Sequence, residues 1–253
     1  MPGQSSDCSP DKPYIWFCHQ TSRDRADPPE WFTAFEARTL AQLEGPRRRE
    51  YLSSRWLIRQ SLSKVSGEAP ENCQPVDGRP IASLIPEGWH LSLSHTRGFT
   101  AVAISRKPLG IDIESRQRKP NWQSVAKRWF TPVEQEWLLN TNSPVDFLKV
   151  WTLKEAWLKA TQRGIAGNLK TLEVRENYEL IGDQQSSHWR SCSCYVEGYL
   201  ASLVYQAGEN ETAASWPNIT LLVPPLEDFA LTPSATLNVD WEPVLHRSIS
   251  AKR

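Results

Sequence analysis

Residues 151–160 (WTLKEAWLKA) constrain the fold most strongly, because they predict a helix with one long apolar side. The segment holds good helix formers, no internal glycine or proline, and apolar residues three and four positions apart. Ser143 is the expected N-cap, Pro144 stands at the first helical position, and Gly164 provides an end. The predicted apolar stripe consists of Phe147, Val150, Trp151, Trp157 and Leu158.

Three charged residues of this helix need an explanation. Lys154 falls inside the apolar stripe, where a charge is unusual. Glu155 and Lys159 are four positions apart, so they are neighbours on the flank of the stripe. One interpretation is a solvated ion pair that contributes a few tenths of a kcal/mol. The other is a functional pair, and this interpretation depends on a second acidic segment upstream.

That acidic segment is residues 109–114 (LGIDIE), which alternate as a strand does. Asp112 and Glu114 then project from one face of the strand, about 7 Å apart. Carboxylates are poor strand formers and repel each other, so a cation between them would remove a penalty. Hard oxygen ligands suit Mg²⁺, which often shares its coordination shell with phosphate oxygens. A solvated polar face at a strand end is the alternative interpretation.

The composition argues against two classes of protein. The 253 residues carry a formal net charge of zero, which disfavours a general nucleic-acid binder and leaves only a local basic site. No apolar run reaches the length of a membrane span, and the N-terminus lacks the hydrophobic core of a signal peptide. Five cysteines without a metal-binding spacing indicate free thiols in a reducing cytosol. We therefore expect a globular, cytoplasmic protein.

Hydropathy patterns predict an α+β fold that divides near Leu109. Helices are expected over residues 31–43, 46–64 and 122–130, and Thr131 begins a capping box for another helix. Strands are expected over residues 14–18, 89–94, 99–105, 109–114, 171–175, 178–181, 189–195 and 199–205. Weak periodicity after residue 226 predicts a loosely packed tail over 227–253.

The helix predicted over residues 46–64 is unusually basic. Arg48, Arg55 and Arg59 fall on one of its faces. Such arginines can lay their aliphatic stems over a core while the guanidinium groups stay in water. They can also bind phosphate through two parallel hydrogen bonds. The helix alone does not decide between these two roles.

Taken in order, the motifs resemble those of a known family. A basic helix precedes DGRP (77–80), LSLSH (91–95), GIDIE (110–114) and WTLKEAWLKA (151–160). This order resembles the 4′-phosphopantetheinyl transferases, specifically the longer monomeric type that activates peptide, polyketide and siderophore synthetases. The resemblance covers roughly residues 47–180. It implies two similar subdomains in a pseudo-twofold arrangement, each a small, mainly antiparallel sheet packed with helices. The corresponding domains are 1–108, which binds CoA, and 109–226, which holds the metal and the catalytic residues.

The resemblance also implies residue roles in the second half. Asp112, Glu114 and Glu155 match the family's three ligands for Mg²⁺. Lys154 and Lys159 match the two lysines of its W-x-x-K-E-x-x-x-K motif, so both are expected to contact phosphate. Glu155 and Lys159 are the expected catalytic residues, one accepting the proton of the attacking serine and the other meeting the leaving phosphate.

In the first half, five residues are implied to bind CoA. Ser94 and His95 match the pair at the 3′-phosphate end, and Arg79 matches a basic residue that precedes proline. Arg47 and Arg48 match basic residues at the head of the first helix. Taken alone, His95 reads more simply as a turn histidine with its hydrogen bonds satisfied.

The implied activity transfers phosphopantetheine from CoA to a serine of an apo carrier protein and releases 3′,5′-ADP. The partners are then CoA and carrier-protein domains, and the protein is expected to be a monomer. A non-catalytic module that binds CoA or a carrier protein is the alternative. A nucleic-acid binder that uses the arginine-rich helix is a third interpretation, and it agrees poorly with a net charge of zero.

Overall fold

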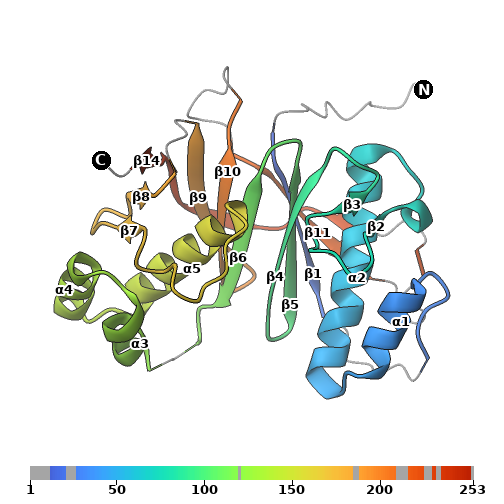
Figure 1. The fold of residues 1–253 in the computed structure, drawn as a ribbon, viewed down its shortest axis with the longest axis horizontal. Helices are drawn as coiled ribbons and strands as arrows, with labels where there is room; N and C mark the ends of the chain where they lie inside the picture. The colour runs from blue at the N-terminus through green and yellow to red at the C-terminus, as the bar shows by residue number, and fades with distance from the viewer. Residues whose placement is uncertain are drawn as a thin grey trace.

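A computed structural model describes residues 12–20, 27–118, 121–184, 188–208, 216–224, 230–231 and 235–251. Figure 1 shows two groups of helices on opposite sides of the molecule, with long strands between them. The mixture of small sheets and helices confirms the predicted α+β class. Among the described residues, no helix is both long and apolar enough to cross a membrane.

The first half of the chain forms a sheet that is covered by one long helix. Its elements are β1 (Tyr14–His19), α1 (Ala34–Ala41), α2 (Gly45–Ser66), η1 (Pro70–Asn72), β2 (Gln74–Pro75), β3 (Leu84–Ile85), β4 (His90–Thr96) and β5 (Phe99–Ser105). Strand β1 pairs antiparallel with β5, and β5 pairs antiparallel with β4. Apolar side chains of α2 such as Trp56 and Leu57 pack in one cluster with Trp16 and Cys18 of β1.

The second half repeats this plan. Its elements are β6 (Leu109–Ser115), α3 (Trp122–Trp129), α4 (Pro132–Thr141), α5 (Pro144–Ala160), β7 (Glu173–Val174), β8 (Leu180–Gly182), β9 (Trp189–Val196) and β10 (Tyr199–Gln206). Strand β6 pairs antiparallel with β10, and β10 pairs with β9. The order β6-β10-β9 therefore matches β1-β5-β4 in the first half.

The C-terminal region differs from the sequence-based expectation. It forms β11 (Asn218–Val223), β12 (Ala235–Leu237), β13 (Trp241–Ser248) and β14 (Ser250–Ala251). Strand β11 returns to the first sheet and runs parallel to β1, whereas β13 pairs with β9 in the second sheet. Strand β12 pairs with β11, so the described part of residues 227–253 contributes to both sheets, and Leu245 and Ile249 are buried in the second core. The prediction of a loose tail failed because pairing with a distant strand leaves little local periodicity.

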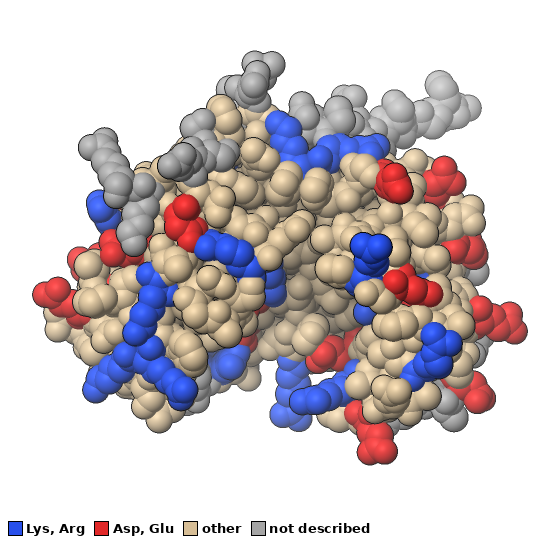
Figure 2. All heavy atoms as spheres, viewed as in Figure 1, with Lys and Arg blue, Asp and Glu red and all other residues tan. Residues whose placement is uncertain are grey.

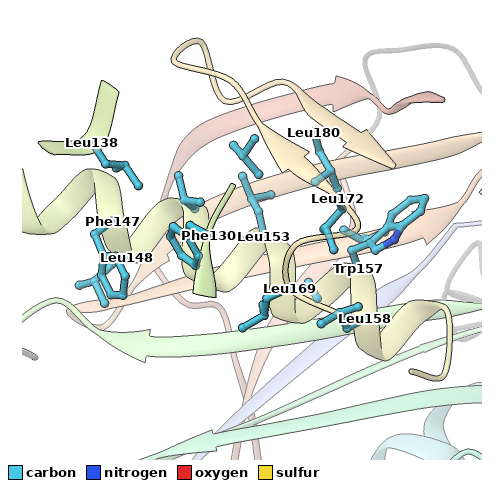
Figure 3. Packing of buried hydrophobic residues seen from close by; sticks show 14 of the residues in the cluster. Phe130, Leu138, Phe147, Leu148, Leu153, Trp157, Leu158, Leu169, Leu172 and Leu180 are labelled. Carbon is cyan, nitrogen blue, oxygen red and sulfur yellow. The ribbon is translucent and has the colours of Figure 1, made fainter. Parts of the chain in front are cut away.

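Helix α5 is the centre of the second core. Ser143 caps it by accepting a hydrogen bond from the Asp146 amide, and Pro144 is its first residue, as predicted. Figure 3 shows Leu153 and Trp157 of this helix beside Leu172 and Leu180, which come from the chain that follows it. The capping box predicted at Thr131 is also present, at the start of α4.

Strand β6 has the predicted alternation. Leu109, Ile111 and Ile113 lie in a cluster between the two sheets, together with Ile15 and Phe17 of β1. The intervening residues therefore face α5, which packs on the other side of the strand.

Gly110 brings α5 into direct contact with β6. A Cβ atom at this position would lie 2.1 Å from the carbonyl oxygen of Ala156 and 2.3 Å from the amide nitrogen of Ala160. Only glycine fits at this distance, so Gly110 sets how closely the helix approaches the strand.

The two sheets meet edge to edge through serine side chains. Ser92 and Ser94 of β4 accept hydrogen bonds from the amides of Ile111 (3.0 Å) and Ile113 (3.3 Å) of β6. These hydroxyls take the place of a neighbouring strand's carbonyl groups, so β4 and β6 lie side by side although no ladder joins them.

Lys154 is part of a fully buried ion pair. Its Nζ lies 2.6 and 2.7 Å from the two carboxylate oxygens of Glu134 and 3.0 Å from the Leu172 carbonyl oxygen. Glu134 also accepts hydrogen bonds from the amides of Val174 and Thr131. The pair thus connects α5 with the start of α4 and with β7.

We expect Gly110→Ala to lower the free energy of unfolding by about 1–3 kcal/mol, because the added methyl group must push α5 away from β6. Denaturant titration measures the change. Gly164→Ala is the matched control, since a Cβ there meets no atom within 4 Å. Equal unfolding midpoints for the two variants would contradict the close approach.

We expect Lys154→Met to cost about 3–5 kcal/mol, because it leaves the Glu134 charge buried without its partner. Combining it with Glu134→Gln should recover part of that loss, since no uncompensated charge remains. Thermal and denaturant unfolding of the single and double variants measure both effects. A single variant as stable as the wild type would show that the pair does not form.

Candidate active site at the junction of the two halves

Asp112 occupies the point where β4, β6 and α5 meet. Its side chain is buried, and its Oδ1 lies 2.9 Å from Ser94 Oγ and 2.8 Å from Lys159 Nζ. The first half supplies the serine and the second half supplies the other two residues. Three of the predicted site residues are therefore in direct contact across the junction.

Lys159 is held by three acceptors at once. Besides Asp112, its Nζ donates to Ser94 Oγ (3.0 Å) and to the Ile111 carbonyl oxygen (3.0 Å). Its side chain is 30% exposed, so Lys159 is partly open to solvent. A cation fixed in this way can meet a negatively charged ligand without a large reorganisation.

Glu155 lies one turn before Lys159 and is buried. Burial, followed by the charge of Asp112, raises the pKa of Glu155 to about 7, whereas Lys159 and Arg118 act in the opposite direction. The raised pKa reflects the cost of holding two carboxylates close together in a poorly hydrated site. Glu155 is buried and the Lys159 side chain is 30% exposed, so the fully solvated surface pair considered from the sequence does not describe them.

Glu114 is the third predicted carboxylate. It is buried two residues beyond Asp112 on the same face of β6, and its Oε1 is in contact with Nη1 of Arg118. Arg118 was not among the residues predicted from the sequence, although its position four residues after Glu114 was a usable signal.

The carboxylates fit a hard cation in their chemistry. Oδ2 of Asp112 is buried and has no hydrogen-bond partner among the described residues. Such an atom costs free energy unless a donor or a cation meets it. Within the same described ranges, no three histidine, cysteine or acidic side chains are already gathered as a metal-ligand cluster. By donor type and by the orphan oxygen of Asp112 the carboxylates fit Mg²⁺, although in the described part of the chain they are not drawn together as a ligand cluster.

The predicted nucleotide-binding residues lie in the first half. His95 follows Ser94 at the end of β4, and its Nε2 is 3.1 Å from Oε1 of Glu50 in α2. Arg47 is exposed near the start of α2, and Nη1 of Arg48 donates to the Leu40 carbonyl oxygen at 2.5 Å.

Arg79 is exposed in the loop before β3, where it lines a cavity of about 50 Å³ together with Tyr51 and Arg55. The sequence analysis did not connect Tyr51 with this region. The roles of Arg47, Arg48 and Arg79 in binding CoA stay predictions.

Two basic residues, Lys154 and Arg59, are buried in ion pairs inside the protein. Lys154 is enclosed by Glu134 and the Leu172 carbonyl group, so the predicted phosphate contact does not agree with its burial. Arg59 is fully buried, forms two hydrogen bonds with Glu36, and lies 4.7 Å from the Trp31 ring centroid. Neither role considered from the sequence describes Arg59, because its guanidinium group is buried in an ion pair with Glu36 and does not stay in water.

Figure 2 shows that the face viewed there is hollowed between the two halves, with lysines and arginines on both sides of the hollow. Acidic side chains are interspersed among them, which agrees with a net charge of zero. The basic character is therefore local, as a site for a phosphate-bearing ligand requires.

Comparisons with known proteins agree with this geometry. A family model described as the 4′-phosphopantetheinyl transferase superfamily matches residues 108–204, and one described as the 4′-phosphopantetheinyl transferase N-terminal domain matches residues 35–105. The two matched regions lie on either side of the junction that contains the site.

Similar curated proteins bear the same family name. The protein slr0495 of Synechocystis sp. is 27% identical over 198 residues, covering 72% of this chain and 79% of that protein. The 4′-phosphopantetheinyl transferase psf-1 of Bacillus pumilus is 33% identical over 136 residues, covering 51% of this chain and 55% of the relative. HetI of Nostoc sp. is 32% identical over 136 residues, with coverages of 50% and 57%.

The chain thus spans about half the length of several curated relatives that it matches and more of one. Two adjacent family matches and a site shared between the matched regions lead to one assignment. This chain belongs to the 4′-phosphopantetheinyl transferase superfamily.

Proposed function

We propose that this chain transfers the 4′-phosphopantetheine group of CoA to a serine of an apo carrier protein, giving the holo carrier protein and 3′,5′-ADP. The contact of Asp112, Lys159 and Ser94 across the junction is the observation that carries this proposal. It provides a buried anionic centre and a fixed cation in one hollow, which a pyrophosphate-bearing substrate with a metal ion requires.

Asp112, Glu114 and Glu155 would hold Mg²⁺ in this site. When bound, the ion would neutralise charge on the pyrophosphate of CoA during transfer. The orphan Oδ2 of Asp112 and the raised pKa of Glu155 support this proposal, because both report a site that is short of positive charge.

Glu155 would remove the proton from the serine hydroxyl of the carrier protein, directly or through water. The serine oxygen would then attack the phosphorus that bears the pantetheine arm. A new P–O bond forms to the serine oxygen, and the P–O bond to 3′,5′-ADP breaks. The serine proton goes to Glu155, and the negative charge leaves on 3′,5′-ADP.

Lys159 would meet that leaving charge. Its ammonium group is fixed by three acceptors beside Asp112, so it needs little reorganisation as the bond breaks. Because the negative charge grows as the bond breaks, Lys159 stabilises the transition state more than the ground state. Removing Lys159 should therefore lower kcat.

Arg47, Arg48, Arg79, Ser94 and His95 would bind the nucleotide end of CoA. Four of the five are cationic or can become so, and all five belong to the first half or its edge strand. Arginine and histidine suit the 3′-phosphate, which distinguishes CoA from dephospho-CoA. Lys154 is left out of this set because it is buried with Glu134.

We also propose a monomer in the cytoplasm. One chain supplies both sides of the junction, so the site needs no second subunit. Three of the described cysteines, Cys18, Cys73 and Cys194, are buried thiols outside any disulfide, in keeping with a reducing compartment. Cys8 lies outside the described residues.

The intact mass of apo carrier proteins after incubation with CoA, Mg²⁺ and this protein tests the function. A gain equal to one phosphopantetheine group supports transfer. Binding of CoA with no mass gain on any carrier would favour the alternative, a non-catalytic module.

We expect Lys159→Ala to lower kcat by roughly 10²-fold, by analogy with the loss of one oxyanion donor. Lys159→Arg should recover part of the rate, since it keeps the charge but not the compact ammonium group. Lys149→Ala on the same helix is the control, because its Nζ contacts Tyr178 and Asp146 instead. A normal kcat for Lys159→Ala with a lowered unfolding midpoint would rule out the catalytic role.

We expect Mg²⁺ to raise the unfolding midpoint of the wild type, because a cation that binds only the folded state stabilises it. Asp112→Asn should abolish that shift and most of the turnover while the protein still folds. Thermal unfolding with Mg²⁺ and with EDTA measures this without an activity assay. Full turnover of the wild type in EDTA would contradict the metal site.

A further inference from the structure

We propose that Glu50 is a positioning residue for His95, a role that rests on the proposed binding of CoA in this cleft. Glu50 is in the second turn of α2, directly after Arg47, Arg48 and Arg49. A carboxylate in this basic segment, beside the proposed site of a phosphate, would weaken phosphate binding if nothing engaged it.

The structure engages this carboxylate with His95. Oε1 of Glu50 lies 3.1 Å from Nε2 of His95, and the two side chains are 28% and 44% exposed. This contact holds Nε2 against Glu50 at ion-pair distance, which restricts the rotation of the ring about its side-chain bonds. In the described part of the chain no hydrogen bond is made by Nδ1 of His95, so this nitrogen is the one available to a ligand.

The contact also joins the two elements that border the proposed nucleotide site. Glu50 belongs to α2, and His95 follows Ser94, which is itself hydrogen bonded to Asp112 and Lys159. A carboxylate that orients a histidine in this way acts through the imidazole, as carboxylates do behind histidines that ligate metals. Glu50 therefore acts on the 3′-phosphate indirectly: it positions His95, and His95 contacts the phosphate.

An exposed ion pair without a binding role has a different signature. Such pairs contribute little to stability and nothing to ligand affinity. Removing Glu50 would then leave nucleotide binding unchanged or, because a nearby negative charge is lost, strengthen it. The two roles therefore differ in the direction of the effect on affinity.

Isothermal titration calorimetry with 3′,5′-ADP and with 5′-ADP, which lacks the 3′-phosphate, separates them. We expect Glu50→Ala to weaken 3′,5′-ADP about tenfold, the scale of one hydrogen bond to a charged group, and to leave 5′-ADP unchanged. Glu50→Gln, which keeps an oxygen acceptor, should restore most of the affinity. In the His95→Ala background, Glu50→Ala should have no further effect.

Glu44→Gln is the matched control. It removes one negative charge at the N-cap of the same helix, where the side chain makes no capping hydrogen bond. Unchanged or tighter binding of 3′,5′-ADP by Glu50→Ala would overturn the assignment. Equal losses for both nucleotides, or additive losses in the double variant, would overturn it as well.

Calorimetry does not depend on group transfer. If the variants show the expected affinities for 3′,5′-ADP but the wild type adds no mass to a carrier protein, the role of Glu50 stands and the transferase activity is contradicted. If the wild type modifies the carrier protein but the variants show no coupling between Glu50 and His95, the transferase activity stands and the role of Glu50 is contradicted.

Discussion

The contact among Ser94, Asp112 and Lys159 is the interaction on which the rest of the structure depends. It brings together polar atoms from the edge of the first sheet, the edge of the second sheet and the central helix α5. Gly110 allows the helix to come close enough, and the serine hydroxyls satisfy the amides of β6 that no strand covers. The junction of the halves and the proposed site are therefore one arrangement of residues.

Much of this arrangement could be predicted because it is encoded locally. The alternation of β6 puts Asp112 on the side facing α5, and the four-residue spacing puts Glu155 and Lys159 on one side of that helix. Ser143 and Thr131 cap their helices through hydrogen bonds to amides three residues away. Each of these features involves only a few consecutive residues, so the sequence pattern was sufficient to find it.

Features that depend on distant partners could not be predicted in the same way. Lys154 is explained by Glu134, twenty residues earlier, and His95 contacts Glu50 on another element. The strands β11 and β13 take their places by pairing with β1 and β9, so their own sequences carry only a weak signal. The order of the motifs supplied the family resemblance, and only the structure showed which basic residues are enclosed.

The most direct test compares Ser94→Ala with Ser92→Ala. Both serines accept a hydrogen bond from an amide of β6, but only Ser94 also contacts Asp112 and Lys159. The measurement is the rate of phosphopantetheine transfer to a carrier protein at a temperature where both variants are folded. If the junction is the active site, Ser94→Ala loses most of the rate and Ser92→Ala keeps most of it. Equal rates for the two variants would contradict the account.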